Sequence, residues 1–123
     1  MRLTVFHNIA IGDRYRKSLS RLTEGERLPV KDGLDLHYAI YNGGVLGLSA
    51  TDGSELLFFK VLDITRRRGV GAYLYAETVK FVRKKCVTEL VDRTPMAEAH
   101  DSAWESFVSS GAVRECLSFG SQP

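Results

Sequence analysis

Three consecutive arginines followed by a Gly-Val-Gly turn form the stretch of this chain that is best suited to hold an anion. The residues are Arg66, Arg67 and Arg68, then Gly69 and Gly71, and a helical apolar pattern begins at once. A cation at a helix N-terminus costs about 0.3–1 kcal/mol when nothing compensates it. Backbone N–H groups at such a turn bind phosphate, and glycines allow close approach. The pattern therefore predicts a phosphate-bearing ligand here, with a solvated basic turn as the alternative.

Three classes of phosphate ligand are compatible with a glycine turn that opens a helix. A Walker loop requires GxxxxGK[ST], which is absent. A dinucleotide fingerprint requires a third glycine where this chain has Leu74, although Asp92 lies at a suitable distance for a ribose contact. The short remainder of the chain after Asp92 leaves no room for two mononucleotide-binding halves. Coenzyme A is the third class.

The elements ahead of this turn predict an antiparallel meander. Residues 2–9 alternate like a strand, and a helix follows with Asp13 as its cap and an apolar face of Tyr15, Leu19 and Leu22. After a loop over 23–33, three strand-like runs are separated by Asn-Gly and Asp-Gly pairs, which favour tight hairpin turns. These runs are residues 34–41, 44–50 and 55–64. The last run is nearly all apolar, which is typical of a central strand buried on both faces.

The elements after the turn predict a parallel crossover. A helical period covers 70–86, a strand is expected over 87–92, and a strand–helix–strand order implies a parallel neighbour. A further helix over 100–110 and a last strand over 112–119 complete the order. The sequence thus predicts an α/β fold with a mixed sheet, in one domain spanning residues 1–123. The apolar face of the first of these helices comprises Val70, Leu74, Tyr75, Thr78, Val79, Val82 and Cys86.

Composition indicates a globular protein and narrows the classes of partner. The chain has 123 residues, 44% hydrophobic and 26% charged, and a net charge of +2, so bulk charge does not indicate nucleic acid. No apolar run approaches the ~18 residues of a membrane span, and no signal peptide is expected. Cys86 and Cys116 lack metal-binding spacing, so we expect free thiols in a reducing cytoplasm and no metal.

The arginine–glycine turn resembles motif A, [QR]xxGx[GA], of the GCN5-related N-acetyltransferases, with Arg66–Gly71 as the matching segment. The preceding strand carries Val61 where that family usually has an aliphatic residue. Downstream, the family's NxxAxxxYxxxG helix is matched at Ala103 and Gly111, with Phe107 at the tyrosine position. The expected strand order is also that of the family, except that the C-terminal hairpin is shortened. The resemblance covers about residues 36–119.

The resemblance implies that acetyl-CoA is the co-substrate. Backbone N–H groups across Arg67–Ala72 would hold the pyrophosphate, and the main chain of Phe59 and Val61 would pair with the pantetheine arm. The N–H of Phe59 would stabilise the developing negative charge on the thioester oxygen. The full set of coenzyme-site residues expected from the resemblance is Phe59, Val61, Arg66, Arg67, Arg68, Gly69, Val70, Gly71, Ala72, Ala103 and Phe107.

The resemblance implies an amine acceptor, which must lose a proton before it attacks. A lysine-like amine with a pKa near 10.4 is less than about 0.1% neutral at pH 7, and a carboxylate can accept the proton. Glu55 matches the position of the catalytic glutamate in the histone-acetylating branch, although an exposed turn glutamate is the alternative. Asp63 is the reserve candidate. Phe107 has no proton to give the leaving thiolate, so another residue or water donates it, or the protein is not catalytic.

Three hypotheses about function follow. The first is an N-acetyltransferase acting on a protein lysine, a terminal amine or a small amine. The second is a non-catalytic coenzyme A-binding protein of the same fold. The third is a nucleic-acid-binding module using Arg66–Arg68 and Arg83–Lys85, which is disfavoured because these sets lie about 20 Å apart along one helix. A missing final strand leaves an edge that invites pairing, so we also expect a homodimer, which a monomer mass in gel filtration would oppose.

Overall fold

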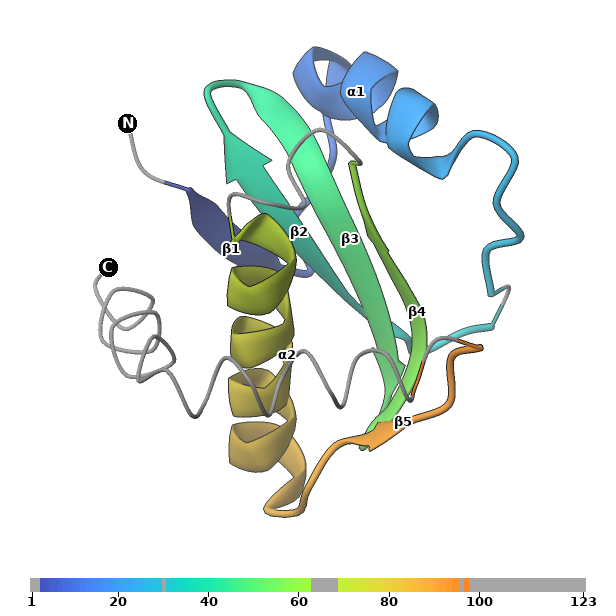
Figure 1. The fold of residues 1–123 in the computed structure, drawn as a ribbon, viewed down its shortest axis with the longest axis vertical. Coiled ribbons are helices and arrows are strands. Elements are labelled where there is room, and N and C mark those ends of the chain that lie inside the picture. The colour runs from blue at the N-terminus through green and yellow to red at the C-terminus, as the bar shows by residue number, and fades with distance from the viewer. Residues whose placement is uncertain (1–2, 30, 63–68, 96, 98–123) are drawn as a thin grey trace.

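The chain folds into a five-stranded mixed sheet with two helices in the computed structural model, which describes residues 3–29, 31–62, 69–95 and 97 (Figure 1). The sheet order is β1-β2-β3-β4-β5, and every neighbouring pair is antiparallel except β4 and β5, which are parallel. The predicted α/β class, meander and crossover are therefore confirmed. The elements are β1 (Thr4–His7), α1 (Asp13–Thr23), β2 (Asp35–Tyr41), β3 (Gly44–Asp52), β4 (Glu55–Val61), α2 (Val70–Cys86) and β5 (Val91–Asp92).

Several predictions fall on the remaining residues. The helix over 100–110, the strand over 112–119 and the shortened hairpin lie outside the described residues. The homodimer and the single-domain organisation stay predictions.

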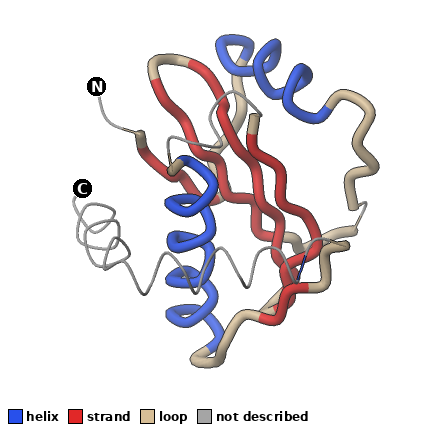
Figure 2. Tube along the Cα trace, viewed as in Figure 1, coloured by secondary structure: helices blue, strands red, loops and turns tan. Residues whose placement is uncertain are grey.

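The two helices pack on opposite faces of the sheet, as the view of the red strands and blue helices in Figure 2 makes clear. Side chains alternate along β2, where Tyr38 and Ile40 pack with Leu22 of α1, and Ala39 packs with Leu74 of α2. The predicted apolar face of α1 is confirmed, since Leu22 is buried and the other two members pack against the same cluster. Each face of the sheet thus has its own core.

The first hairpin turn forms as predicted and the second does so in part. Asn42 and Gly43 both have positive φ, at 50° and 81°, as a two-residue turn of the mirror-image type requires. In the second turn only Gly53 has positive φ, at 59°, and Asp52 remains within β3. Asn42 and Gly43 therefore form the whole of the two-residue turn between β2 and β3.

Three predicted boundaries are wrong for local reasons. The strand over 2–9 is confined to β1, because Asn8 adopts a φ of 55° and ends it. Asp13 is the first helical residue and not the cap, which is Gly12 without a side-chain bond. The strand over 87–92 shortens to Val91–Asp92, because Val87 takes a left-handed conformation and donates its N–H to Arg83 O at 3.0 Å, closing α2.

The prediction that β4 is buried on both faces is also wrong. Leu56, Phe58 and Val61 are buried, whereas the residues between them are only partly buried. The reason is the position of the strand, since β4 pairs with β5 over just two residues at its start. The apolar run indicated burial on both faces, and here it marks a strand whose parallel ladder within the described residues is short.

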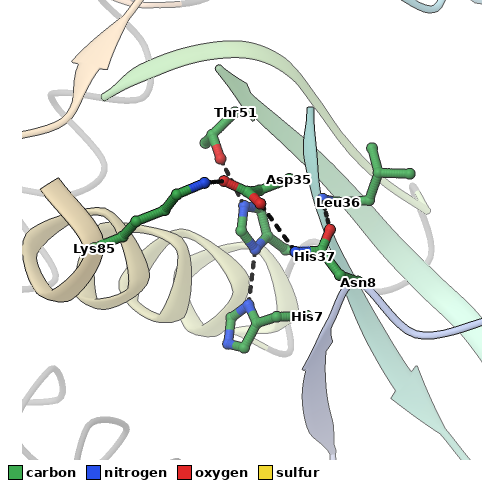
Figure 3. Close-up of polar contacts among 7 residues, drawn as sticks. All are labelled: His7, Asn8, Asp35, Leu36, His37, Thr51 and Lys85. Carbon is green, nitrogen blue, oxygen red and sulfur yellow. Dashed lines mark hydrogen bonds and ion pairs between the residues drawn. The ribbon is translucent and has the colours of Figure 1, made fainter. Parts of the chain in front are cut away.

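A histidine pair joins β1, β2 and the end of α2, although no sequence pattern linked the two histidines (Figure 3). His7 Nδ1 and His37 Nδ1 lie 2.7 Å apart, and His37 Nε2 bonds Thr51 Oγ1 at 2.9 Å. The ring of Phe81 on α2 stacks on His7 and packs edgewise on His37. His37 is fully buried, so its two ring nitrogens find both of their partners inside the protein.

An acidic residue completes the network beside the pair. Asp35 accepts a hydrogen bond from Asn8 Nδ2 at 2.9 Å and forms an ion pair with Lys85 Nζ at 2.5 Å. Burial lowers the pKa of His37 to about 3, with His7 and Lys85 acting in the same direction and Asp35 opposing them. Burial likewise lowers the pKa of His7. Burial therefore favours the uncharged form of both rings.

We predict that Val87→Gly stabilises the protein by about 1 kcal/mol, because a left-handed conformation costs a residue with a Cβ about 1–2 kcal/mol. Val87 has a φ of 53° and a side chain that is almost fully exposed, so no packing is lost. Urea unfolding measures the change. The matched control is Thr88→Gly at an exposed position without positive φ, which we expect not to stabilise. An equal gain in both variants would contradict the strain at Val87.

We predict that the protein loses stability as the pH falls below about 6.5. The unfolded chain takes up protons at the ordinary histidine pKa, whereas folded His37 stays neutral until about pH 3, so its contribution is complete above pH 6.5 and declines below it. For His37 alone the loss between pH 7.5 and pH 5 is about 2 kcal/mol. Urea unfolding across this range measures the slope, and His37→Gln should flatten it. Identical slopes in the two proteins would refute this origin.

Candidate functional site

The N-terminus of α2 is an uncapped helix start. Gly69, the N-cap, has a φ of 77°, a conformation that suits glycine, and it offers no side-chain bond. The first turn contains no acidic residue, and Tyr73 N–H donates to Gly69 O at 2.9 Å. The N–H groups of residues 70–72 therefore precede the helical bonding pattern and point out of the helix end. Such an end attracts an anion.

Glycine at position 71 is not needed by the packing around it. A Cβ added there would lie 3.7 Å from Val61 Cγ2, which is an ordinary contact, whereas a Cβ at Gly69 would meet nothing within 4 Å. No group of the described residues would therefore crowd a Cβ at either glycine. The same contact shows that the end of β4 and the start of α2 lie together. Arg66–Arg68 and Asp63 lie outside the described residues.

An extra residue in β4 reverses the side to which the main-chain N–H and C=O groups of the following residues point. Ala50 pairs with Phe58 and Thr51 with Leu56, so Leu57 has no partner on β3 and forms a bulge. Arg93 N–H bonds Leu56 O at 2.8 Å, which shows that the main chain of Leu56 faces β5.

Beyond the bulge, the residues whose main-chain groups face β3 are the even-numbered ones. Leu62 N–H bonds Leu46 O on the β3 side at 3.0 Å, and hydrogen-bonded pairs alternate along an antiparallel ladder. The main-chain groups of Phe59 and Val61 therefore face away from β3, toward the side of β5. Without the bulge these residues would instead present their N–H and C=O groups to β3.

The two parallel strands separate soon after they meet. Within the described residues, the β4–β5 ladder consists of Glu55 with Val91 and Leu56 with Asp92. Asp92 Oδ1 then accepts bonds from Thr94 N–H at 2.9 Å and Thr94 Oγ1 at 2.6 Å, forming a turn that ends β5. The parallel pair is thus joined at its start, and the β4–β5 ladder of the described residues does not extend to Phe59 and Val61, which pair with β3 on their other side.

Glu55 lies at the start of β4 on the face of the sheet that α1 covers. Its neighbour Leu56 packs with Tyr75 and Val79 of α2, so the side chain of Glu55 points to the other face. The carboxylate is half exposed, and Arg93 Nε lies 3.4 Å from its Oε1. The predicted base candidate is therefore an accessible carboxylate with a cationic neighbour that the sequence did not identify.

The structure brings some predicted residues together and leaves others aside. Phe59, Val61, Gly69, Val70 and Gly71 gather where β4 ends and α2 begins. Ala103, Phe107 and His100 lie outside the described residues. Tyr75 is buried, as its place on the predicted apolar face of the helix indicated, and Tyr73 is buried as well.

Two side chains of the second basic set are already paired. Arg83 donates more than one hydrogen bond to the Glu89 carboxylate, the shortest being 2.9 Å from Nη2 to Oε2. Lys85 forms an ion pair with Asp35. The set is therefore less available to phosphates than its sequence suggested.

The described part of the chain contains no cluster of three or more histidine, cysteine or acidic residues able to hold a metal ion. Among the described helices, none has both the length and the hydropathy of a membrane span.

Two solved structures resemble the chain. YhhK from Escherichia coli, a proposed N-acetyl transferase determined in solution bound to coenzyme A, is 30% identical over 66% of this chain and 69% of that one, with a TM-score of 0.53. An aminoglycoside acetyltransferase, meta-AAC0020, from an uncultured soil metagenomic sample and in complex with trehalose, is 17% identical over 87% and 86%, with a TM-score of 0.57. No family model and no curated protein matches.

The second likeness concerns the fold alone, whereas the first extends to the sequence and covers more than two thirds of its relative. Both relatives are acetyltransferases by name. The sheet order and the separating parallel strands agree with the fold that the resemblance implied, and the glycine helix start agrees with motif A. The chain belongs to the GCN5-related N-acetyltransferase superfamily.

Proposed function

We propose that the protein transfers an acetyl group from acetyl-CoA to a primary amine. The observation that carries the proposal is the juxtaposition of an uncapped glycine helix start with a β4 edge whose main chain faces the diverging side of the sheet. The helix start suits a diphosphate, and the edge of β4 suits an extended arm that carries amides. The coenzyme A bound by YhhK supports the same ligand class for this chain.

The donor would lie along β4 with its diphosphate at the start of α2. The N–H groups of Val70, Gly71 and Ala72, with that of Gly69, are the donors that the helix start offers to phosphate oxygens. Arg66, Arg67 and Arg68 would add charge. The main chain of Phe59 and Val61 would pair with the amides of the pantetheine arm, as an added strand does. Ala103 and Phe107 would complete the coenzyme site.

The reaction would proceed by direct attack on the thioester. The amine nitrogen forms a bond to the carbonyl carbon, the carbon–sulfur bond breaks, and the thiolate leaves and takes up a proton. Phe59 N–H would donate to the carbonyl oxygen as negative charge develops there. Before the attack, Glu55 would accept a proton from the ammonium form of the acceptor, directly or through water, from the face of the sheet opposite α2.

We predict that Gly71→Glu abolishes coenzyme A binding, because it places a carboxylate where the phosphates would lie. Isothermal titration calorimetry measures the affinity. Gly71→Ala is the matched control, since its Cβ meets Val61 at an ordinary distance and should leave folding and binding nearly intact. Unchanged affinity in Gly71→Glu would remove this turn from the site.

We predict that Glu55→Gln lowers kcat about 100-fold or more with the KM for acetyl-CoA little changed, because general base catalysis contributes about 10²–10⁴-fold. Thiol release under saturating acetyl-CoA measures the rate. Asp32→Asn, a carboxylate change in the exposed turn before β2, is the control and should have little effect. A kcat near that of the unchanged protein would exclude Glu55 as the base.

A panel of amines separates the enzyme from a non-catalytic coenzyme A-binding protein. Thermal stabilisation by acetyl-CoA together with thiol release supports transfer. Stabilisation without release across lysine peptides, N-terminal peptides and small amines would contradict it and favour the binding protein.

A further inference from the structure

The outer face of α1 carries cations that have no internal partner. Arg14, Lys17 and Arg21 follow at intervals of three and four residues, so they form one stripe along the helix. All three are exposed, and no carboxylate lies within ion-pair distance of any of them in the described structure. Arg27, in the loop that follows, is likewise exposed and unpaired. Arg14 is held in place over the ring of Tyr15, 5.5 Å from its centroid.

Most other described cations are neutralised by a neighbour. The pairs are Arg16–Asp13, Lys31–Asp52, Lys60–Glu26, Arg83–Glu89, Lys85–Asp35 and Arg93–Glu55. On α2, Lys80 acts electrostatically on Glu77, and Lys84 at the far end of the helix has no such neighbour in the described structure. Among the described residues, the unpaired positive charge is therefore concentrated on α1 and the loop that follows it.

This element borders the face from which the acceptor would approach. Leu22 of α1 packs in the same cluster as Phe58 of β4, which adjoins Phe59. After the helix, Glu26 accepts an ion pair from Lys60 of β4 at 2.8 Å, which holds the loop against that strand. Glu55 points to this same face of the sheet. Arg21 precedes Leu22 and Arg27 follows Glu26, so both cations belong to the segment that packs against β4.

We propose that the acceptor is an amine on a polypeptide with acidic residues around it, which the Arg14–Arg21 stripe and Arg27 bind. The inference rests on the proposed acetyl transfer and specifies its substrate class. A stripe of positive potential raises the local concentration of an anionic partner and repels polycations, an effect that salt weakens. Polyamines, aminoglycosides and lysine-rich tails are therefore disfavoured acceptors.

The dimensions favour a polypeptide over a small molecule. Arg14 and Arg21 are separated by seven residues, which is about 10 Å along a helix. A small amine cannot contact this length and reach the acyl position together, whereas an extended acidic segment can. Nucleic acid has the charge but no aliphatic amine to accept an acetyl group.

Peptides of equal length with one central lysine test the proposal. The lysine is flanked by aspartate and glutamate, by serine and glycine, or by arginine, and acetylation rates are measured at 50 mM and 500 mM NaCl. The expected result is a KM about 10-fold lower for the acidic peptide at low salt, a similar kcat, and loss of the difference at high salt. Spermidine and kanamycin should be poorer acceptors than the acidic peptide.

A charge-reversal variant and a matched control assign the effect to α1. Lys17→Glu/Arg21→Glu changes only exposed side chains and should reverse the preference toward the arginine-flanked peptide, with coenzyme A affinity unchanged. Lys84→Glu, which changes the unpaired cation at the far end of α2, should leave the preference as it was. Circular dichroism and the thermal shift with coenzyme A verify that each variant folds and binds the donor.

Each outcome bears on one of the two proposals. Acetylation of all three peptides with equal KM, or faster acetylation of spermidine or kanamycin, overturns the acidic acceptor and leaves acetyl transfer standing. Tight binding of a single-stranded oligonucleotide that only Lys17→Glu/Arg21→Glu abolishes also overturns it, since the stripe would then serve nucleic acid. Donor binding without acetylation of any peptide or amine refutes acetyl transfer itself, and the acceptor inference with it.

Discussion

The extra residue at Leu57 is the constraint on which the geometry of the site depends. Side chains and main-chain groups alternate strictly along a strand, so one inserted residue reverses the direction of every main-chain group after it. The carbonyl of Leu56 accepts a hydrogen bond from Arg93, just after β5. The ladder to β3 then skips Leu57 and continues with Phe58, which pairs with Ala50. Phe59 and Val61 thereby present their amides to the side on which β5 has already turned away.

The helix start completes what the bulge begins. The first turn of α2 lies beside Val61, where a Cβ on Gly71 would be 3.7 Å from Val61 Cγ2, so the exposed end of the helix adjoins the end of β4. An elongated ligand with a diphosphate at one end and amides along its length matches both parts. A compact phosphate ligand would use the helix start alone and leave the edge of β4 unexplained.

Much of this arrangement was predictable from local sequence signals. Asn42-Gly43 indicated a hairpin, the Gly69-Val70-Gly71 segment indicated a helix start, and the order of elements implied one parallel pair. The bulge was not predictable, because Leu57 lies within an apolar run and nothing in its side chain marks it as the inserted residue.

The remaining differences arise from contacts between distant parts of the chain. The partner of His37 is His7, thirty residues away, and its neighbours on β3 and α2, Thr51 and Phe81, are also distant in the sequence. The pairing of Glu55 with Arg93 likewise depends on the parallel register of β4 and β5. The end of α2 illustrates a third case, since Val87 adopts a conformation that its side chain disfavours and local propensity predicted a strand.

Backbone amide NMR during a coenzyme A titration measures the central claim most directly, since it reports on the main chain that is said to hold the donor. The largest shifts and the strongest slowing of hydrogen exchange should occur at Phe59, Val61 and residues 69–72. Shifts confined to α1 or to the far end of α2 around Val87, with these amides unchanged, would show that the coenzyme binds elsewhere.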